Sequence, residues 1–348
     1  MTATCVLPAF SIDQTLLIVR DLYGIEGTLN ALNGERDLNY LLITDGGRFV
    51  FKIANRNESY AMLECQHLVL QRLEADKVMP QQASSIKSIN QKVIETVTSD
   101  DGIDHFCRLL PYIEGRLLSE VDPHTPALLC DLGRTLAKLD QSLLDFTHQA
   151  LHSHLLWNMG DVLDTLERFK SLLASDAKRA LIEHFEVEFR NTVLPLQEGL
   201  RKGVIHNDAN DNNVLVSGNL AGQQRVSSII DFGDMVYSWL AVEPAVAAAY
   251  AMLDKDKPLD AAVAVIKGYH DQLALTENEI KVLFDFICMR LCMSVCICAY
   301  QQSIEPDNAY LRISEQPAWD LLHKLKSIPH VIAHKTFRDA CKSDADKN

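Results

Sequence analysis

A dense polar segment between two apolar runs constrains the fold of this chain more than any other stretch of its sequence. The apolar residues 203–205 are followed by eight residues, 206–213, that include two aspartates and four asparagines, and residues 214–216 are apolar again. Asparagine and aspartate compete for backbone hydrogen bonds and therefore disfavour the interiors of helices and strands. The pattern predicts a strand, a polar loop that the scaffold holds still, and a second strand.

A second polar stretch follows the next β-branched run. Residues 228–230 lead into Asp231, Phe232, Gly233 and Asp234, so this predicted strand ends on a carboxylate and a glycine. Two carboxylates and an amide at neighbouring strand ends suit a hard cation such as Mg²⁺, which prefers oxygen ligands. We therefore expect the polar loop and this strand end to form one cation site.

The rest of the chain divides into a strand-rich part and a helical part. Alternating apolar residues predict short strands over 27–32, 40–43, 48–53, 93–97 and 106–110, and one amphipathic helix over 59–74. Longer helices are expected over 127–142, 162–174, 176–198 and from about residue 243 onward. The predicted fold class is α+β, with a small antiparallel-sheet lobe (1–110), a connector (111–118), a larger mainly helical lobe (119–341) and a charged tail (342–348).

Composition removes several functional classes. The 348 residues carry a net charge of −14, which argues against a surface that neutralises nucleic-acid phosphates and fits a small cationic substrate. The N-terminal residues lack the pattern of a secretory signal, and the apolar run 282–300 contains Asp285 and Arg290, so we expect a core helix there rather than a membrane span. Nine cysteines without a Cys-x-x-Cys pair favour reduced thiols and a cytoplasmic location.

Phosphoryl transfer requires a carboxylate to orient the attacking hydroxyl, oxygen ligands for a metal, and a fixed cation on the phosphates. Lys52 stands in the middle of the predicted strand 48–53, where a charge needs a partner. Glu64, within the apolar pattern of the following helix, is the favoured partner, and Glu58 at the start of that helix is the alternative.

The spacing His206-x-Asp208-x₄-Asn213, followed by Asp231-Phe232-Gly233, resembles the catalytic and metal loops of kinase-like folds. The chain lacks the glycine-rich loop and the His-Arg-Asp motif of protein kinases, and Lys52 stands far enough before Asp208 for extra helices. These features resemble the aminoglycoside phosphotransferase/choline kinase superfamily, whose fold is bilobal and protein-kinase-like. Within it, the blocks at 34–39, 51–55, 110–115, 204–211 and 231–235 are most similar to the hydroxylysine kinase subfamily.

The resemblance implies a role for each matching residue. It makes Asp208 the catalytic base, and it makes Asn213 and Asp231 the metal ligands. Lys52, steered by Glu64, would contact the nucleotide phosphates. The remaining implied contacts are a turn over the phosphates (Asn33, Gly34, Glu35, Arg36), the backbone at Leu110 and Tyr112 for the nucleotide base, and Asp234 for a substrate amine or a second metal.

Two departures from the family pattern bear on these roles. Gly34 is the only glycine in the nucleotide turn, so the phosphates must rely on other amides or side chains. Trp157 is followed by Asn158 where an acid is expected, which weakens the case for this segment as a cation-binding part of the acceptor site. Arg290 lies among apolar residues, and either a structural ion pair or a substrate carboxylate would satisfy it.

Several other residues have simpler interpretations. Cys288, Cys292 and Cys296 share a helix face, where packing is favoured over a metal or redox site. A zinc site at His152 and His154 is disfavoured because no acid or cysteine stands at ligand spacing. Two further acidic residues also have structural interpretations. Asp211 is interpreted as a loop-stabilising side chain, and Glu243 as a charge that favours a helix N-terminus.

These observations predict a small-molecule kinase that uses Mg²⁺ and ATP or GTP. Its acceptor would be the hydroxyl of an amino alcohol or hydroxy amino acid, with 5-hydroxylysine first and choline, ethanolamine, homoserine or an aminoglycoside as alternatives. A non-catalytic nucleotide- or partner-binding pseudokinase is the alternative from another class, and the missing activation segment argues against a protein kinase. We expect no nucleic-acid or membrane partner, and the sequence leaves the oligomeric state open.

Overall fold

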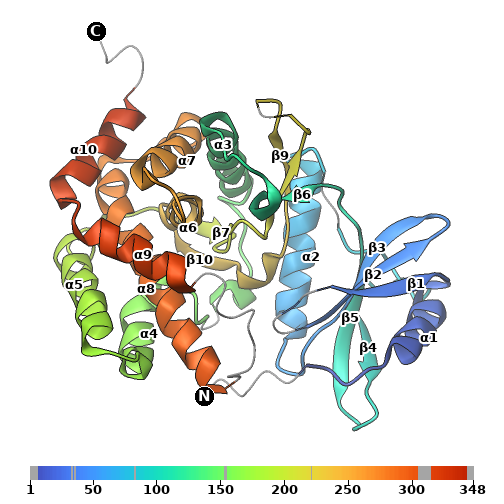
Figure 1. Ribbon diagram of the computed structural model, residues 1–348. Helices are drawn as coiled ribbons and strands as arrows, with labels where there is room; N and C mark the ends of the chain where they lie inside the picture. The colour runs from blue at the N-terminus through green and yellow to red at the C-terminus, as the bar shows by residue number, and fades with distance from the viewer. Residues whose placement is uncertain are drawn as a thin grey trace. The chain divides into compact units, whose positions relative to one another are not determined.

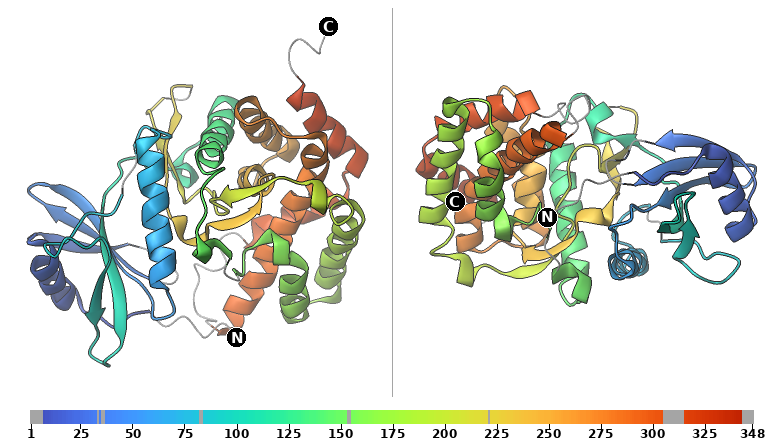
Figure 2. Two further views of the ribbon diagram at one scale, coloured as in Figure 1. Left: turned by 180° about the vertical axis from the view of Figure 1, so that it is seen from behind. Right: turned by 90° about the horizontal axis from the view of Figure 1, so that it is seen from below.

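The computed structural model describes residues 7–32, 34, 37–81, 84–152, 155–220, 222–304 and 315–342. The chain forms two compact units, of which the smaller comprises residues 1–114 and 148–150 and the larger comprises residues 115–147 and 151–348. Figures 1 and 2 show the elements of each unit. The division after Glu114 lies within the connector that the sequence predicts at 111–118.

The smaller unit is built on a five-stranded antiparallel sheet in the order β1-β2-β3-β5-β4. Its strands are β1 (Thr28–Leu32), β2 (Leu38–Thr44), β3 (Gly47–Ile53), β4 (Glu95–Thr98) and β5 (Asp104–Pro111). A tight turn at Asp45-Gly46 joins β2 to β3, and the register then places Lys52 of β3 between Asn39 of β2 and Arg108 of β5. Lys52 therefore lies within a strand, as the sequence predicts, and the structure places that strand at the centre of the sheet.

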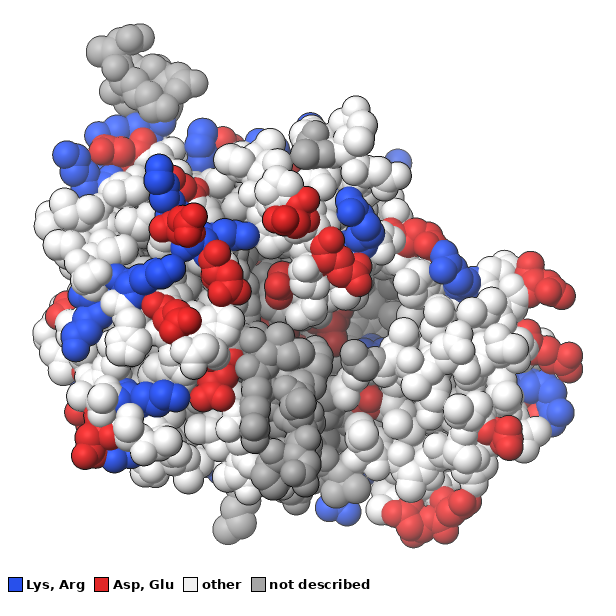
Figure 3. All heavy atoms as spheres, viewed as in Figure 1, with Lys and Arg blue, Asp and Glu red and all other residues white. Residues whose placement is uncertain are grey.

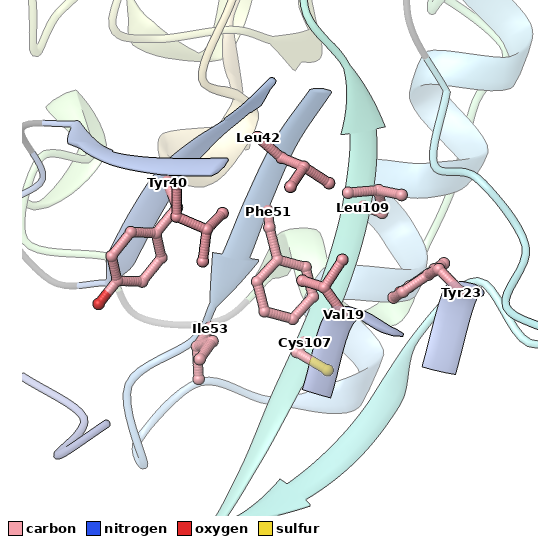
Figure 4. Close-up of a cluster of buried hydrophobic side chains, with 9 residues drawn as sticks. Val19, Tyr23, Tyr40, Leu42, Phe51, Ile53, Cys107 and Leu109 are labelled. Atoms are coloured by element: carbon pink, nitrogen blue, oxygen red, sulfur yellow. The ribbon is translucent and has the colours of Figure 1, made fainter. Parts of the chain in front are cut away.

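The described part of this unit contains two α-helices, whereas the sequence predicts one. The expected helix is α2 (Tyr60–Ala75), and the additional one is α1 (Ile12–Tyr23). Helix α1 begins at a capping box in which the Ser11 hydroxyl accepts from the Gln14 amide, a start signal that the sequence contains. Its apolar face packs on the sheet in a buried cluster (Figure 4) made of Val19, Tyr23, Leu29, Tyr40, Leu42, Phe51, Ile53, Cys107 and Leu109.

The larger unit is mainly helical. Its α-helices are α3 (Pro126–Ser142), α4 (Val162–Phe169), α5 (Asp176–Thr192), α6 (Val242–Ala251), α7 (Pro258–Gln272), α8 (Glu277–Ile304), α9 (Glu315–Lys326) and α10 (His330–Cys341). Short 3₁₀ turns are η1 (Leu118–Glu120), η2 (Gln149–His152), η3 (Met159–Asp161), η4 (Lys170–Leu172), η5 (Gln197–Gly199) and η6 (Phe232–Asp234). Helices α4 and α5 end before the predicted residues 174 and 198, and Pro195 prevents α5 from continuing to 198.

Two small sheets interrupt these helices and carry the polar loop. Strands β6 (Arg116–Leu117), β8 (Val214–Ser217) and β9 (Arg225–Ile229) form one sheet, and β7 (Lys202–Ile205) pairs with β10 (Val236–Trp239) in the other. The sequence predicts the strands that flank the polar loop, whereas β6 and β10 were not predicted. Both of these strands are short and pair with strands remote in sequence, with Arg116 opposite Val216 and Val236 opposite Ile205.

Helix α8 forms the centre of the larger unit (Figures 1 and 2). It is long and apolar enough to cross a membrane by length and composition, but 89% of its most apolar window is buried inside the fold. This burial is what a core helix requires, so the structure agrees with the expectation for residues 282–300. On the face seen in Figure 3, acidic and basic side chains are interspersed over α9 and α10.

Candidate active site

The polar loop leaves β7 at His206, whose imidazole joins two strand ends. The ring Nε2 lies 3.0 Å from the Ile230 carbonyl oxygen, and the ring Nδ1 accepts from the Asp208 amide at 3.3 Å. Burial lowers the pKa of His206, so the ring is neutral with its proton on Nε2. The histidine therefore connects the loop to the end of β9, immediately before Asp231.

Asn207 and Glu243 hold the backbone of the loop from the other side. Asn207 has a φ of 65°, a left-handed conformation that asparagine tolerates, and its Nδ2 donates to the carbonyls of Trp157 and Asp234. Glu243 of α6 is fully buried, and its Oε2 accepts from the amides of His206 and Asn207. These bonds fix the loop directly before Asp208.

The side chain of Asp208 is 20% exposed, and both of its oxygens are held. Oδ1 accepts from Nη2 of Arg290 at 2.7 Å. Oδ2 accepts from the amide nitrogens of Asn213 at 2.7 Å and Asn210 at 3.0 Å. Since each carboxylate oxygen has two lone pairs, the predicted base can still accept a hydrogen bond from an acceptor hydroxyl.

Arg290 comes from the middle of α8, and its side chain is only 2% exposed. Its guanidinium lies 4.3 Å from the ring centre of Trp157 and 5.5 Å from that of Tyr250. The structure thus places Arg290 against the predicted base and Trp157 against Arg290, and both were predicted as substrate residues. Sequence reasoning did not find Tyr250, because it lies on an almost uniformly apolar helix without a motif.

The electrostatics of this centre follow from its burial. Burial raises the pKa of Asp208 to about 7, while the charge of Arg290 opposes the rise and that of Asp234 adds to it. Burial also raises the pKa of Glu243 to about 7, against the hydrogen bonds from Asn207 and His206. Asp140 of α3, near Glu243, has a pKa raised well above its ordinary value for the same reason.

The predicted metal ligands suit a divalent cation. Asp231 follows β9 as an exposed residue in a left-handed conformation (φ 61°), and its Oδ1 accepts from the Gly233 amide. The side-chain nitrogen of Asn213 donates to the Asp208 carboxylate, so the side-chain oxygen of Asn213 is the atom that could bind a cation. Within the described ranges no three His, Cys, Asp or Glu side chains gather at a metal-binding distance. One carboxylate and one amide oxygen are ligands that a divalent cation accepts, and substrate phosphates can complete such a site.

The remaining acceptor-side predictions have mixed outcomes. Asp234, on η6, is buried and close enough to Asp208 to raise its pKa. Asn158, where an acid was expected, has a structural role: its Oδ1 accepts from the Gly160 amide and caps η3, and it also accepts from the Ser238 hydroxyl. Its environment therefore explains the departure from the family pattern.

The smaller unit carries the nucleotide-side predictions. The Gly34 position is crowded, since an added Cβ would lie 2.2 Å from the Asn39 side chain and 2.7 Å from the Asp37 carbonyl oxygen. The Asp37 carboxylate in turn accepts from the backbone and side chain of Asn55 after β3. Three other residues of this turn, Asn33, Glu35 and Arg36, lie outside the described residues.

Lys52 and Glu64 both lie in this unit, and their pairing remains a prediction. The carboxylate of Glu64 is 48% exposed and lies 3.7 Å from Nε2 of His148. At the end of β5, the Tyr112 amide donates to the Arg48 carbonyl. The Arg48 guanidinium lies over the Tyr112 ring, 4.8 Å from the ring centre. Leu110 lies opposite Val50 in the sheet register.

The other residues considered have structural surroundings. Cys288, Cys292 and Cys296 are buried free thiols, as packing predicts, and the eight cysteines in the described ranges are all unbridged. The ring of His152 lies against Tyr237, whereas His154 lies outside the described residues. The backbone carbonyl of Asp211 accepts from the Ser119 amide, and the loop-stabilising role of its side chain stays a prediction.

A half-buried aspartate, an adjacent amide and a second aspartate at a strand end, within a two-unit α+β chain, define a phosphotransferase that acts on hydroxyl acceptors. The model of the phosphotransferase enzyme family (APH) matches residues 28–277, and the chain belongs to this family. It is 29% identical to hydroxylysine kinase of Bos taurus, across 97% of this chain and 94% of the relative. It is also similar to homoserine kinase of Zymomonas mobilis, at 23% identity across 77% and 80% of the two chains.

Solved structures share the fold at low sequence identity. Amicoumacin kinase hAmiN, in a complex with AMP-PNP, Ca²⁺ and its ligand, superimposes with a TM-score of 0.70 at 14% identity over 92% of this chain and 97% of that one. A microcompartment-associated aminopropanol kinase gives 0.67 at 17% identity over 93% and 97%. These similarities confirm the predicted bilobal, protein-kinase-like fold.

Proposed function

We propose that this enzyme transfers the γ-phosphoryl group of ATP or GTP to the hydroxyl of a hydroxy amino acid, with 5-hydroxylysine as the acceptor, Mg²⁺ as the metal and the cytoplasm as its location. The observation that carries the proposal is the arrangement of Asp208, held through both oxygens beside Asn213 and Arg290. The similarity to hydroxylysine kinases over nearly the whole chain supports the choice of acceptor.

In this proposal the protein contributes mainly orientation and electrostatics. Asp208 would accept a hydrogen bond from the acceptor hydroxyl and take its proton as the hydroxyl oxygen bonds to the γ-phosphorus and the bond from that phosphorus to the departing nucleoside diphosphate breaks. The amides of Asn210 and Asn213 would keep Oδ2 in place during this step. Holding the hydroxyl in line with the γ-phosphorus lowers the entropic cost of bringing the two reactants together, and this accelerates the reaction.

Asn213 and Asp231 would hold the metal ion, which would neutralise charge that develops on the phosphates. Lys52 would supply a second fixed cation from the smaller unit.

A coupled assay of nucleotide consumption tests the proposal. It crosses ATP and GTP with 5-hydroxylysine, homoserine, ethanolamine, choline and kanamycin in the presence of Mg²⁺. We expect turnover with 5-hydroxylysine, and a loss of at least about 100-fold in Asp208→Asn with nucleotide affinity unchanged. Asp164→Asn makes the same chemical change at an exposed aspartate of α4 and serves as the matched control.

Each other result has a defined meaning. Turnover with a different acceptor would keep the reaction and replace the substrate. Undiminished turnover in Asp208→Asn would refute the role of this carboxylate. Nucleotide binding without turnover for any acceptor would favour a pseudokinase.

A further inference from the structure

The guanidinium of Arg290 has more donors than the protein satisfies. Nη2 donates to Asp208 at 2.7 Å and lies 3.4 Å from the Tyr250 hydroxyl. Nε and Nη1 are buried, and the structure of the described ranges offers neither of them a hydrogen-bond acceptor. An unsatisfied buried donor is destabilising, most of all on a charged group, so its retention beside the reacting carboxylate calls for a functional explanation.

A purely structural arginine in the same unit looks different. Arg201, before β7, donates from Nε and Nη2 to the two carboxylate oxygens of Glu279 and from Nη2 to the Ala274 carbonyl. The ion pair between Arg201 and Glu279 is bidentate. The Glu279 carboxylate also accepts from the Thr276 amide in the turn before α8, so its contacts are structural. Arg290, in contrast, makes a single contact to the carboxylate that the reaction uses.

We propose that Arg290 binds the carboxylate of the acceptor through these remaining donors and so selects hydroxy amino acids over amino alcohols. This inference rests on the proposed function and specifies the substrate class of the same site. A carboxylate is the planar anion that complements a guanidinium, and it would satisfy N–H groups that the fold leaves unpaired.

The neighbouring groups complement the rest of such an acceptor. Arg290 holds Asp208 by one nitrogen, so an anion on its other nitrogens would bring a nearby hydroxyl of the same molecule towards Asp208. Buried Asp234 provides negative charge for an ammonium group. Trp157, which covers the guanidinium, belongs to an irregular segment between η2 and η3, so its ring is not fixed by a helix or strand.

Matched acceptors that differ only in the carboxylate test the inference. One pair is 5-hydroxylysine and the diamino alcohol left when its carboxylate is removed, and the other is homoserine and aminopropanol. The kcat/KM of both members is measured for the wild type, Arg290→Lys and Arg290→Gln. Arg201→Gln is the control, because it removes an arginine whose ion pair is structural.

We expect the wild type to prefer the carboxylate-bearing member by roughly 10- to 100-fold, the range set by one charged hydrogen-bonding contact. Arg290→Gln should bring this ratio close to one, mainly through a higher KM for the acid, while Arg290→Lys retains part of it. Arg201→Gln should leave the ratio unchanged even if it lowers stability.

Two outcomes would overturn the inference. Equal losses for both members in Arg290→Gln would show that Arg290 only positions Asp208, while the proposed function survives. A wild type that prefers acceptors without a carboxylate would refute the inference together with the choice of a hydroxy amino acid. A preference for homoserine over 5-hydroxylysine would change the proposed acceptor but leave the role of Arg290 supported by the second pair.

Discussion

Glu243 supports the loop before Asp208, and replacing it by glutamine should change how stability depends on pH. Its Oε2 accepts from the amides of His206 and Asn207 while its side chain is fully buried. Glutamine retains the size of the side chain and a carbonyl oxygen for these amides, but it cannot ionise. The substitution therefore separates the hydrogen bonds from the burial of charge.

The size of the effect follows from the pKa of Glu243, which burial raises from an ordinary 4.5 to about 7. Between these values the folded protein holds a proton that the unfolded chain has released, so the stability of the wild type falls as the pH rises through this window. The difference corresponds to about 3 kcal/mol. Asp140 and Arg290 also face Glu243, and both remain in the variant.

Urea unfolding of the wild type and Glu243→Gln at several pH values from 5 to 8 measures this difference. We expect similar free energies of unfolding at pH 5, and a variant that is about 2–3 kcal/mol more stable than the wild type at pH 8. The exposed Glu183→Gln on α5 is the matched control and should follow the wild type throughout. Parallel curves for the wild type and Glu243→Gln would refute the reasoning.

Two further substitutions test the packing around this site. Tyr269→Phe removes the hydroxyl that donates to the buried Asp140 at 2.5 Å, and urea unfolding should show a loss of about 1–3 kcal/mol, whereas no loss would mean that Asp140 has another donor. Gly133→Ala places a methyl 1.9 Å from the Val265 carbonyl oxygen between α3 and α7, so the helices must separate and stability should fall by more than about 2 kcal/mol. Gly199→Ala meets only a side chain at 3.4 Å, and an equal loss there would contradict the packing argument.

The local elements of the site could be predicted because each has a local cause. The polar residues 206–213 exclude helix and strand, and the β-branched run before Asp231 favours a strand, so both loops lie where the sequence places them. Lys52 lies within the strand that the sequence predicts for a similarly local reason, the pattern of apolar residues around it. Helix α1 also had a local signal, the capping box at Ser11, which the sequence analysis did not use.

The contacts that hold Asp208 have no such local signal. Glu243 does lie in the first turn of α6, as expected of an acid that favours a helix N-terminus, but its carboxylate also binds the loop some 36 residues earlier. Arg290 allowed two interpretations from sequence, and the structure shows an ion pair whose partner is the predicted base itself. These pairings depend on which faces of α6 and α8 turn inward.

The sequence by itself determined the identity and order of the chemical groups, since the loop motif, the strand-borne lysine and the alternation of apolar residues are properties of short segments. Only the tertiary structure decided that Arg290 contacts Asp208, that Trp157 and Tyr250 lie against Arg290, and that Glu243 holds the loop before Asp208. The physical reason is that α8 is apolar on nearly every side. Its periodicity cannot specify a register, which is set instead by close packing against α4, α5 and α6.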